Sequence, residues 1–351
     1  MNPLSALPPF QKLSLSDPDA KTLLGPLYDM AGTWTNDPEQ GWNLIAVPGP
    51  LDSDGDPNYF NNAHGFILET IPYIETITFT PISVTLNRGQ FRPQVSFGKP
   101  PSDEQQIQQI GALLYEQRIN SAGVDKSNPN YEAITAFFAK RGFSEGTPIH
   151  AEQGMLLNIL NFDDYGLENF QIARMGTIPH GNAMLCLGTN ETVPSPNISP
   201  DGINALPTPV DPSRGMPVEY TINSYLSPDH SIEGYPFYPH FIPSSPNQTL
   251  INANEGVEFE STNHLSLSTQ NGTGGLLSIP FVGGGFDGTQ IRTTDMTVDY
   301  WISKVKGTGE IRIQYAQNIS IIFPTKLDLS LPIIWPHIGL NTLRKTGEVE
   351  E

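Results

Sequence analysis

The stretch Glu75-Thr76-Ile77-Thr78-Phe79-Thr80 alternates polar and apolar side chains with a period of two residues. Successive side chains of a β-strand point to opposite faces, so this period is typical of a strand with one packed face and one wet face. Similar segments, rich in β-branched and aromatic residues and bounded by turn residues, recur along the chain. We predict strands at 42–47, 65–70, 75–80, 112–119, 149–159, 170–178, 183–187, 257–259, 264–268, 275–280, 295–305 and 310–323. The pattern predicts an all-β fold.

Two segments carry helical signals instead. Near the N-terminus, Ser16 or Asp17 can cap a helix with Pro18 in its first turn, and this helix should end before Gly32. A second helix is predicted at 130–140, where we expect it to cover or flank the β-structure. Its apolar residues at the i, i+3 and i+4 positions are Ile134, Phe137 and Phe138.

Proline distinguishes residues 190–246 from the rest of the chain. It recurs throughout this tract, and it cannot donate the hydrogen bonds that a sheet requires. We therefore predict an extended, Pro-rich excursion with at most short strands. No clean linker separates two complete patterns, so we expect one β-barrel domain over 1–351 with a core at about 28–343.

Charge and composition exclude several classes of protein. The 18 Lys and Arg against 37 Asp and Glu give a formal charge of −19, which repels phosphate backbones and anionic membranes. No apolar run approaches the ~18–20 residues of a spanning helix. Cys186 is the single cysteine, and the N-terminus lacks the basic and apolar regions of a secretory signal. We expect a soluble, cytoplasmic, acidic protein that binds neither nucleic acid nor membranes.

Two histidines stand near predicted strand ends. His150 and Glu152 lie two residues apart in one predicted strand and so share a face, as a carboxylate-oriented imidazole requires. His180 follows a strand and precedes Gly181 at a turn, and barrel mouths are where ligands bind. An imidazole there can serve as an axial ligand to haem iron or as a general base. The structural alternative is that each histidine only hydrogen-bonds across the barrel.

The segment Gly32-Thr33-Trp34 ends the first helix and opens a strand. Glycine permits the turn, and the tryptophan is placed to plug one end of a barrel, with Arg312 from a late strand stacked on its indole. The alternative is a tryptophan packed in an ordinary core.

Several stretches together resemble a bacterial and fungal family of calycin-like β-barrel proteins commonly labelled haem-binding. They are 32–34 with 41–45, Glu75-Thr76-Ile77-Thr78-Phe79-Thr80-Pro81-Ile82 with 87–89, Ile149-His150-Ala151-Glu152, Arg174-Met175-Gly176-Thr177-Ile178-Pro179-His180-Gly181, 313–317 and Trp335-Pro336-His337-Ile338. The resemblance spans roughly 28–343. Members of the family usually have His-Ile-Glu-Pro-Gly where this chain has His150-Ala151-Glu152-Gln153-Gly154.

The resemblance implies one large antiparallel barrel in the style of lipocalins and nitrobindins, with haem or another flat hydrophobic molecule as its ligand. Our leading hypothesis is a binding protein with His180 as the first candidate ligand to haem iron and His150 with Glu152 as the second. Arg174, Tyr115 and Trp34 are further candidate contacts to the ligand.

Two other functions remain open. A metal-free isomerase or cyclase could act on a hydrophobic metabolite inside the barrel, because one carboxylate and one imidazole in a dry pocket suffice for proton transfer. Glu152 would then be the acid or base with His150 beside it, and Tyr115 and Arg174 would orient the substrate. A purely structural or interaction protein is the third possibility.

Overall fold

A computed structural model of the chain describes residues 11–48, 66–84, 110–123, 126–127, 131–140, 142, 144–159, 170–178, 181–215, 244–278, 292–323 and 332–348. Its strands are β1 (Gln11–Lys12), β2 (Gly32–Thr35), β3 (Gly41–Pro48), β4 (Phe66–Val84), β5 (Ile110–Ser121), β6 (Pro148–Ile159), β7 (Ile172–Ile178), β8 (Asn182–Val193), β9 (Thr208–Pro209), β10 (Phe259–Ser268), β11 (Gly275–Ser278), β12 (Arg292–Val305), β13 (Ile311–Phe323) and β14 (Ile333–Gly347). The helices are α1 (Ala20–Leu24), α2 (Tyr131–Lys140), α4 (Gln248–Asn252) and the 3₁₀ segments η1 (Gly25–Met30) and η4 (Pro212–Arg214).

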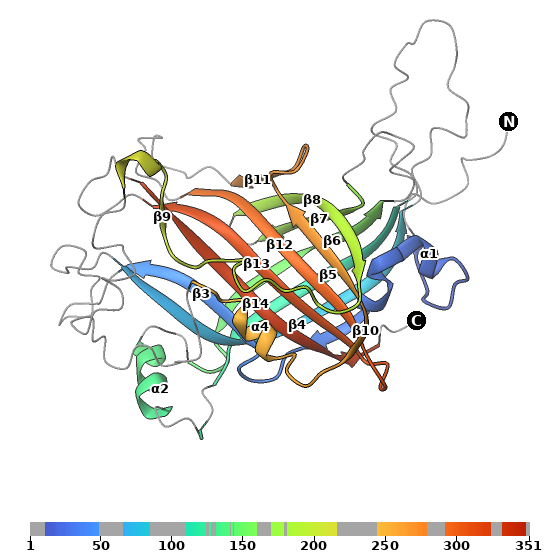
Figure 1. Cartoon of the computed structure of the whole chain (residues 1–351), viewed down its shortest axis with the longest axis horizontal. Coiled ribbons are helices and arrows are strands. Elements are labelled where there is room, and N and C mark those ends of the chain that lie inside the picture. The colour runs from blue at the N-terminus through green and yellow to red at the C-terminus, as the bar shows by residue number, and fades with distance from the viewer. Residues whose placement is uncertain are drawn as a thin grey trace, which may run out of the picture.

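The strands form one antiparallel sheet that closes on itself into a ten-strand barrel (Figure 1). Starting from β4, the order is β2 with β3, then β14, β13, β12, β10, β8, β7, β6 and β5, which pairs with β4 again. β2 and β3 occupy one position, because both lie between β4 and β14 at different heights. The predicted all-β antiparallel barrel with a short N-terminal helix is confirmed.

The N-terminal helical segment packs against one end of the barrel (Figure 1). The side-chain amide of Asn158, at the end of β6, donates to the Leu23 carbonyl at 2.9 Å. Gly111 on β5 allows this close approach, because a Cβ there would lie 1.9 Å from the same carbonyl. The helix ends before Gly32 as predicted, but its N-cap is Asp19 rather than Ser16 or Asp17.

Trp34 lies at this plugged end, fully buried in the core. Its indole donates to the Met30 carbonyl at 2.7 Å. Arg312 does not stack on it, which corrects our expectation. Ile313 points into the core, so Arg312 points outward, where its guanidinium lies 6.0 Å from the Phe259 ring centroid and donates to the Ala253 carbonyl.

Prolines within strands explain two differences from the predicted elements. The predicted strands 65–70 and 75–80 are parts of the single strand β4, and β14 was not predicted. Pro72, between the two predicted strands, lies just beyond the pairing of β4 with β5, whose last pair is Tyr73 with Ser121, and Pro336 on β14 lies between the stretches that pair with β9 and β3. A proline is tolerated there because the partner strand is absent and no ladder hydrogen bond is lost.

Some of the remaining predicted elements lie within the described residues, and others lie partly outside them. The second helix forms at 131–140 as α2. Of the Pro-rich tract, 190–215 and 244–246 are described, where β8 continues to Val193 and β9 adds a short pair with β14. The extended excursion as a whole stays a prediction. Within the described part of the chain, no helix is long and apolar enough to cross a lipid bilayer.

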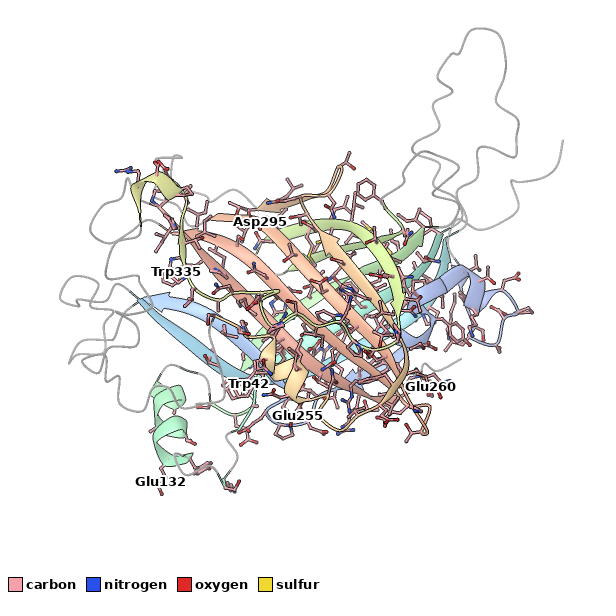
Figure 2. The ribbon with its side chains drawn as sticks, in the orientation of Figure 1. Trp42, Glu132, Glu255, Glu260, Asp295 and Trp335 are labelled. Atoms are coloured by element: carbon pink, nitrogen blue, oxygen red, sulfur yellow. The ribbon has the colours of Figure 1, made fainter. Side chains whose placement is uncertain are left out.

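Side chains alternate between the inside and the outside of the barrel. On β5, Leu113, Tyr115, Gln117 and Ile119 are buried, whereas the residues between them are exposed. Figure 2 shows Glu260 and Trp335 at opposite ends of the barrel, with Glu260 nearer α1. At the α1 end the interior is apolar, and further towards Trp335 it also contains buried polar side chains.

Candidate functional site

Several polar side chains are buried inside the barrel, where each needs a hydrogen-bonding partner to offset its lost hydration. They are Asn36, Glu75, Gln117, Glu152, Arg174 and Asn341. They form two clusters, one around each carboxyl group.

The first cluster is centred on Arg174, which β7 holds with only 2 % of its surface exposed. Its guanidinium donates to Glu152 Oε1 at 2.8 Å, to the Tyr115 hydroxyl at 3.2 Å and to Gln317 Oε1 at 2.9 Å. The Tyr115 hydroxyl also donates to Glu152 Oε1. The rings of Tyr115 and Tyr300 lie beside the guanidinium, at 5.4 and 5.8 Å from centroid to Cζ. The cation is therefore fully enclosed by partners.

Glu152 is ionised in this setting. Burial raises the pKa of its carboxyl, but the charge of Arg174 and the contacts from His150, Tyr115 and Arg174 outweigh burial and lower the pKa to about 2. The imidazole Nε2 of His150 lies 3.5 Å from the second oxygen, Oε2, which accepts no hydrogen bond of normal geometry among the described residues. Glu152 thus presents a buried negative charge to His150.

Two facing glycines make room for this cluster. Gly154 on β6 pairs with Gly176 on β7. A Cβ at Gly176 would lie 2.5 Å from the Tyr115 hydroxyl and 3.0 Å from Glu152 Oε1, and one at Gly154 would lie 2.7 Å from the same hydroxyl. Any larger residue would push the phenol away from the carboxylate.

The second cluster surrounds Glu75 on β4. Gln117 donates to Oε1 at 2.7 Å, and Asn341 donates to Oε2 at 2.6 Å. The Tyr315 hydroxyl lies 2.6 Å from Oε2 and 2.8 Å from the Tyr73 hydroxyl. Burial raises the pKa of Glu75 by more than these hydrogen bonds and the charge of Arg174 lower it. The pKa values of the two buried carboxyl groups are therefore shifted in opposite directions: that of Glu152 is lowered and that of Glu75 is raised.

A cavity of about 380 Å³ lies beside both clusters. It is at the Trp335 end of the barrel (Figure 2), because Ile321, which lines it, pairs with Trp335 across β13 and β14. Apolar side chains supply much of the wall: Ile119, Ile149, Leu276, Ile319 and Ile321. Polar side chains from the two clusters also line it: Tyr73, Gln117, His150, Tyr315 and Gln317. An apolar pocket with a few convergent polar groups is typical of a small-molecule site.

The structure brings four of the six candidate residues together. His150 lines the cavity, and Glu152, Arg174 and Tyr115 form the cluster behind it. Trp34 lies apart from them at the plugged end. His180 lies outside the described residues.

Sequence reasoning did not identify the Glu75 cluster as part of a site. The signal was present, because alternation from Ile77 and Phe79 places Tyr73 and Glu75 on the same inward face. Among the residues that the structure describes, no group of three or more His, Cys, Asp or Glu side chains is arranged to hold a metal ion.

The lowered pKa of Glu152 makes the free energy of unfolding depend on pH. Its folded-state pKa of about 2 lies below the ordinary value of 4.5, so its stabilising effect is present above pH 4.5 and is lost as the pH falls towards 2. The loss is on the order of 3 kcal/mol. Glu75 has the opposite effect. Its contribution to the free energy of unfolding is fully present below its ordinary pKa and is lost as the pH rises through its raised pKa in the folded protein.

Urea unfolding from pH 7 down to about pH 3 measures this effect. The matched control is the double variant Arg174→Met/Glu152→Gln, which lacks the ion pair. We expect the wild type to lose more unfolding free energy than the control below pH 4.5. Equal losses would show that Glu152 is not held ionised by its partners.

Comparison with models of known protein families and with curated proteins finds no match to this chain. The closed barrel agrees with the fold that the calycin resemblance implied. Membership of that family stays a proposal.

Proposed function

We propose that this protein is a metal-free enzyme that moves a proton on a small hydrophobic molecule held in the barrel cavity. The observation that carries the proposal is the His150 imidazole, which lines the cavity with its Nε2 3.5 Å from the buried, ionised Glu152. An isomerase or cyclase needs a base of this kind and no further cofactor.

His150 is placed to act as the base. Its side chain is 17 % exposed, whereas Glu152 is completely buried, so a bound molecule meets the imidazole first. When the imidazole takes a proton it becomes positive, and the carboxylate behind it stabilises that charge. Arg174 and Tyr115 hold the carboxylate in place and act as positioning residues.

The cavity favours a small apolar substrate. Its volume of about 380 Å³ is near the lower end of the range for small-molecule sites, about 300–1,000 Å³. The isoleucine-rich wall gives a bound molecule little hydrogen bonding, so the polar side chains set its orientation. A proton attached to carbon, next to an activating group, is the simplest target for such a base.

The test uses 2-tetralone, a bicyclic ketone whose α-protons are acidic. In D₂O we expect the wild type to accelerate deuterium incorporation at the α-carbons, followed by NMR. Gly339→Val should reduce this rate, because residue 339 lines the cavity and a Cβ there would meet its nearest atoms at 3.9 Å without strain. No acceleration over protein-free buffer, or an unchanged rate in Gly339→Val, would contradict catalysis in the cavity.

Haem is a second candidate ligand, favoured by an imidazole in an apolar cavity. The described lining fits haem poorly, because His150 turns Nε2 towards Glu152, the second lining histidine, His337, contacts Asn43 through Nε2 at 2.8 Å, and no Lys or Arg among the described lining residues can pair with the haem carboxylates. A saturable Soret band on adding haemin, weakened in His150→Ala or His180→Ala, would support this candidate. Absence of the band would exclude it.

A further inference from the structure

The second carboxyl cluster has no role in the proton abstraction described above. We propose that Glu75 is a protonated acid that, through the hydroxyls of Tyr315 and Tyr73, supplies a proton to a carbonyl oxygen of the bound molecule. This inference rests on the proposed function and deepens it, because it defines the substrate class as enolisable ketones or enones.

Counting the protons along the chain of hydroxyls supports a protonated Glu75 carboxyl. Three contacts link four groups: Leu340 carbonyl to Tyr73 hydroxyl at 3.0 Å, Tyr73 to Tyr315 at 2.8 Å, and Tyr315 to Glu75 Oε2 at 2.6 Å. Each tyrosine hydroxyl carries one proton, and the backbone carbonyl carries none. Two protons cannot fill three hydrogen bonds, so for all three contacts to be hydrogen-bonded the third proton comes from the Glu75 carboxyl.

The resulting order runs in one direction. An ionised Glu75 would accept from Tyr315; with Glu75 protonated, its carboxyl instead donates to Tyr315, Tyr315 donates to Tyr73, and Tyr73 donates to the Leu340 carbonyl. Complete burial of Glu75, which raises its pKa, favours the same protonation state. A carboxylic acid that burial keeps neutral still carries the proton that the chain of hydroxyls requires.

The end of this chain faces the cavity. Tyr73 and Tyr315 both line it, and Gly339 leaves space there, since a Cβ at 339 would lie 4.0 Å from the Tyr73 hydroxyl. The Tyr73 proton can turn from the Leu340 carbonyl to an oxygen of a bound molecule.

The acid and the base are separated by a distance that suits a small substrate. His150 on β6 is paired with Ile119 on β5, which is paired with Glu75 on β4. The two backbones are thus two strand spacings apart, about 10 Å. Both side chains point inward, so a molecule between them can meet a base at one carbon and a proton donor at its oxygen.

The proton transfers balance without a co-reactant. His150 takes a proton from the carbon next to the carbonyl, the C–H electron pair forms a C=C bond, and the carbonyl π pair takes the proton of Tyr73. Tyr73 is reprotonated by Tyr315, and Tyr315 by Glu75, so an enol, a protonated His150 and a Glu75 carboxylate remain. The amides of Gln117 and Asn341, at 2.7 and 2.6 Å, stabilise that carboxylate. Reprotonation at the same carbon returns every proton and regenerates the ketone; from an enone the intermediate is a dienol, and reprotonation at its γ-carbon returns every proton and moves the C=C bond.

Two measurements test the inference. Infrared spectroscopy at neutral pH should show the C=O stretch of a protonated carboxylic acid, shifted in D₂O and absent in Glu75→Gln. If that variant does not fold, labelling glutamate with ¹³C in the wild type should shift the same band. An absent band means that Glu75 is ionised and overturns the inference.

Binding then tests the oxygen site with 2-tetralone and tetralin, which has the same rings without the carbonyl. We expect the wild type to bind 2-tetralone about tenfold more tightly than tetralin, and Tyr73→Phe to bind both equally. A preference that survives in Tyr73→Phe overturns the role of the hydroxyl chain while leaving His150 catalysis standing. If neither compound binds the wild type, the proposed function fails with the inference.

Discussion

Replacing His150 with glutamine is expected to slow deuterium incorporation into 2-tetralone by about 10²- to 10⁴-fold, the usual contribution of a positioned general base. Glutamine keeps a polar side chain of similar size beside Glu152 but cannot accept and release a proton at neutral pH. NMR time courses of the two proteins at equal concentration measure the ratio directly.

His264→Gln is the matched control for this variant. His264 lies outside the cavity lining, where it contacts Asp299 at 2.9 Å and stacks on Trp301. We expect the control to exchange 2-tetralone at the wild-type rate. Equal slowing in both variants would point to a general loss of structure, and no slowing in His150→Gln would remove the base from the proposal.

Replacing Arg174 with methionine is expected to lower the free energy of unfolding by about 3–5 kcal/mol, the typical cost of leaving one member of a buried ion pair alone. The substitution removes the donors at 2.8 Å to Glu152 and at 2.9 Å to Gln317, and it leaves the Glu152 charge without its cation. Urea unfolding at neutral pH gives the difference.

The double variant Arg174→Met/Glu152→Gln separates the charge from the packing. With the buried anion also removed, most of the loss should be recovered, because an uncharged pair of similar volume is often no less stable than the ion pair. A double variant as unstable as Arg174→Met alone would show that Arg174 stabilises the barrel mainly by packing.

Most of the fold could be predicted from alternation and turn residues. The strands at 112–119, 149–159, 295–305 and 310–323 are present with small changes at their ends. β14 was missed because Pro336 and Gly339 interrupt its pattern, and only the positions of the neighbouring strands show why these residues are tolerated there. Strand order is a long-range property that alternation does not encode.

The same limit applies to the site. The spacing of His150 and Glu152 places both on one strand face, and their contact at 3.5 Å follows from it. The Glu75 cluster instead depends on closure of the barrel, which brings Tyr315 and Asn341 from 240 and 266 residues away. A pattern can indicate that Glu75 points inward, but its contacts with Tyr315 and Asn341 are fixed only by the register of β13 and β14.

The structure of the protein bound to 2-naphthol tests the central claim most directly, because this phenol resembles the enol of 2-tetralone. Our account predicts the naphthol inside the cavity, with its hydroxyl within hydrogen-bonding distance of Tyr73 and a ring carbon beside the imidazole of His150. A naphthol bound elsewhere, or bound in the cavity with its hydroxyl turned away from Tyr73 and its ring away from His150, would contradict it.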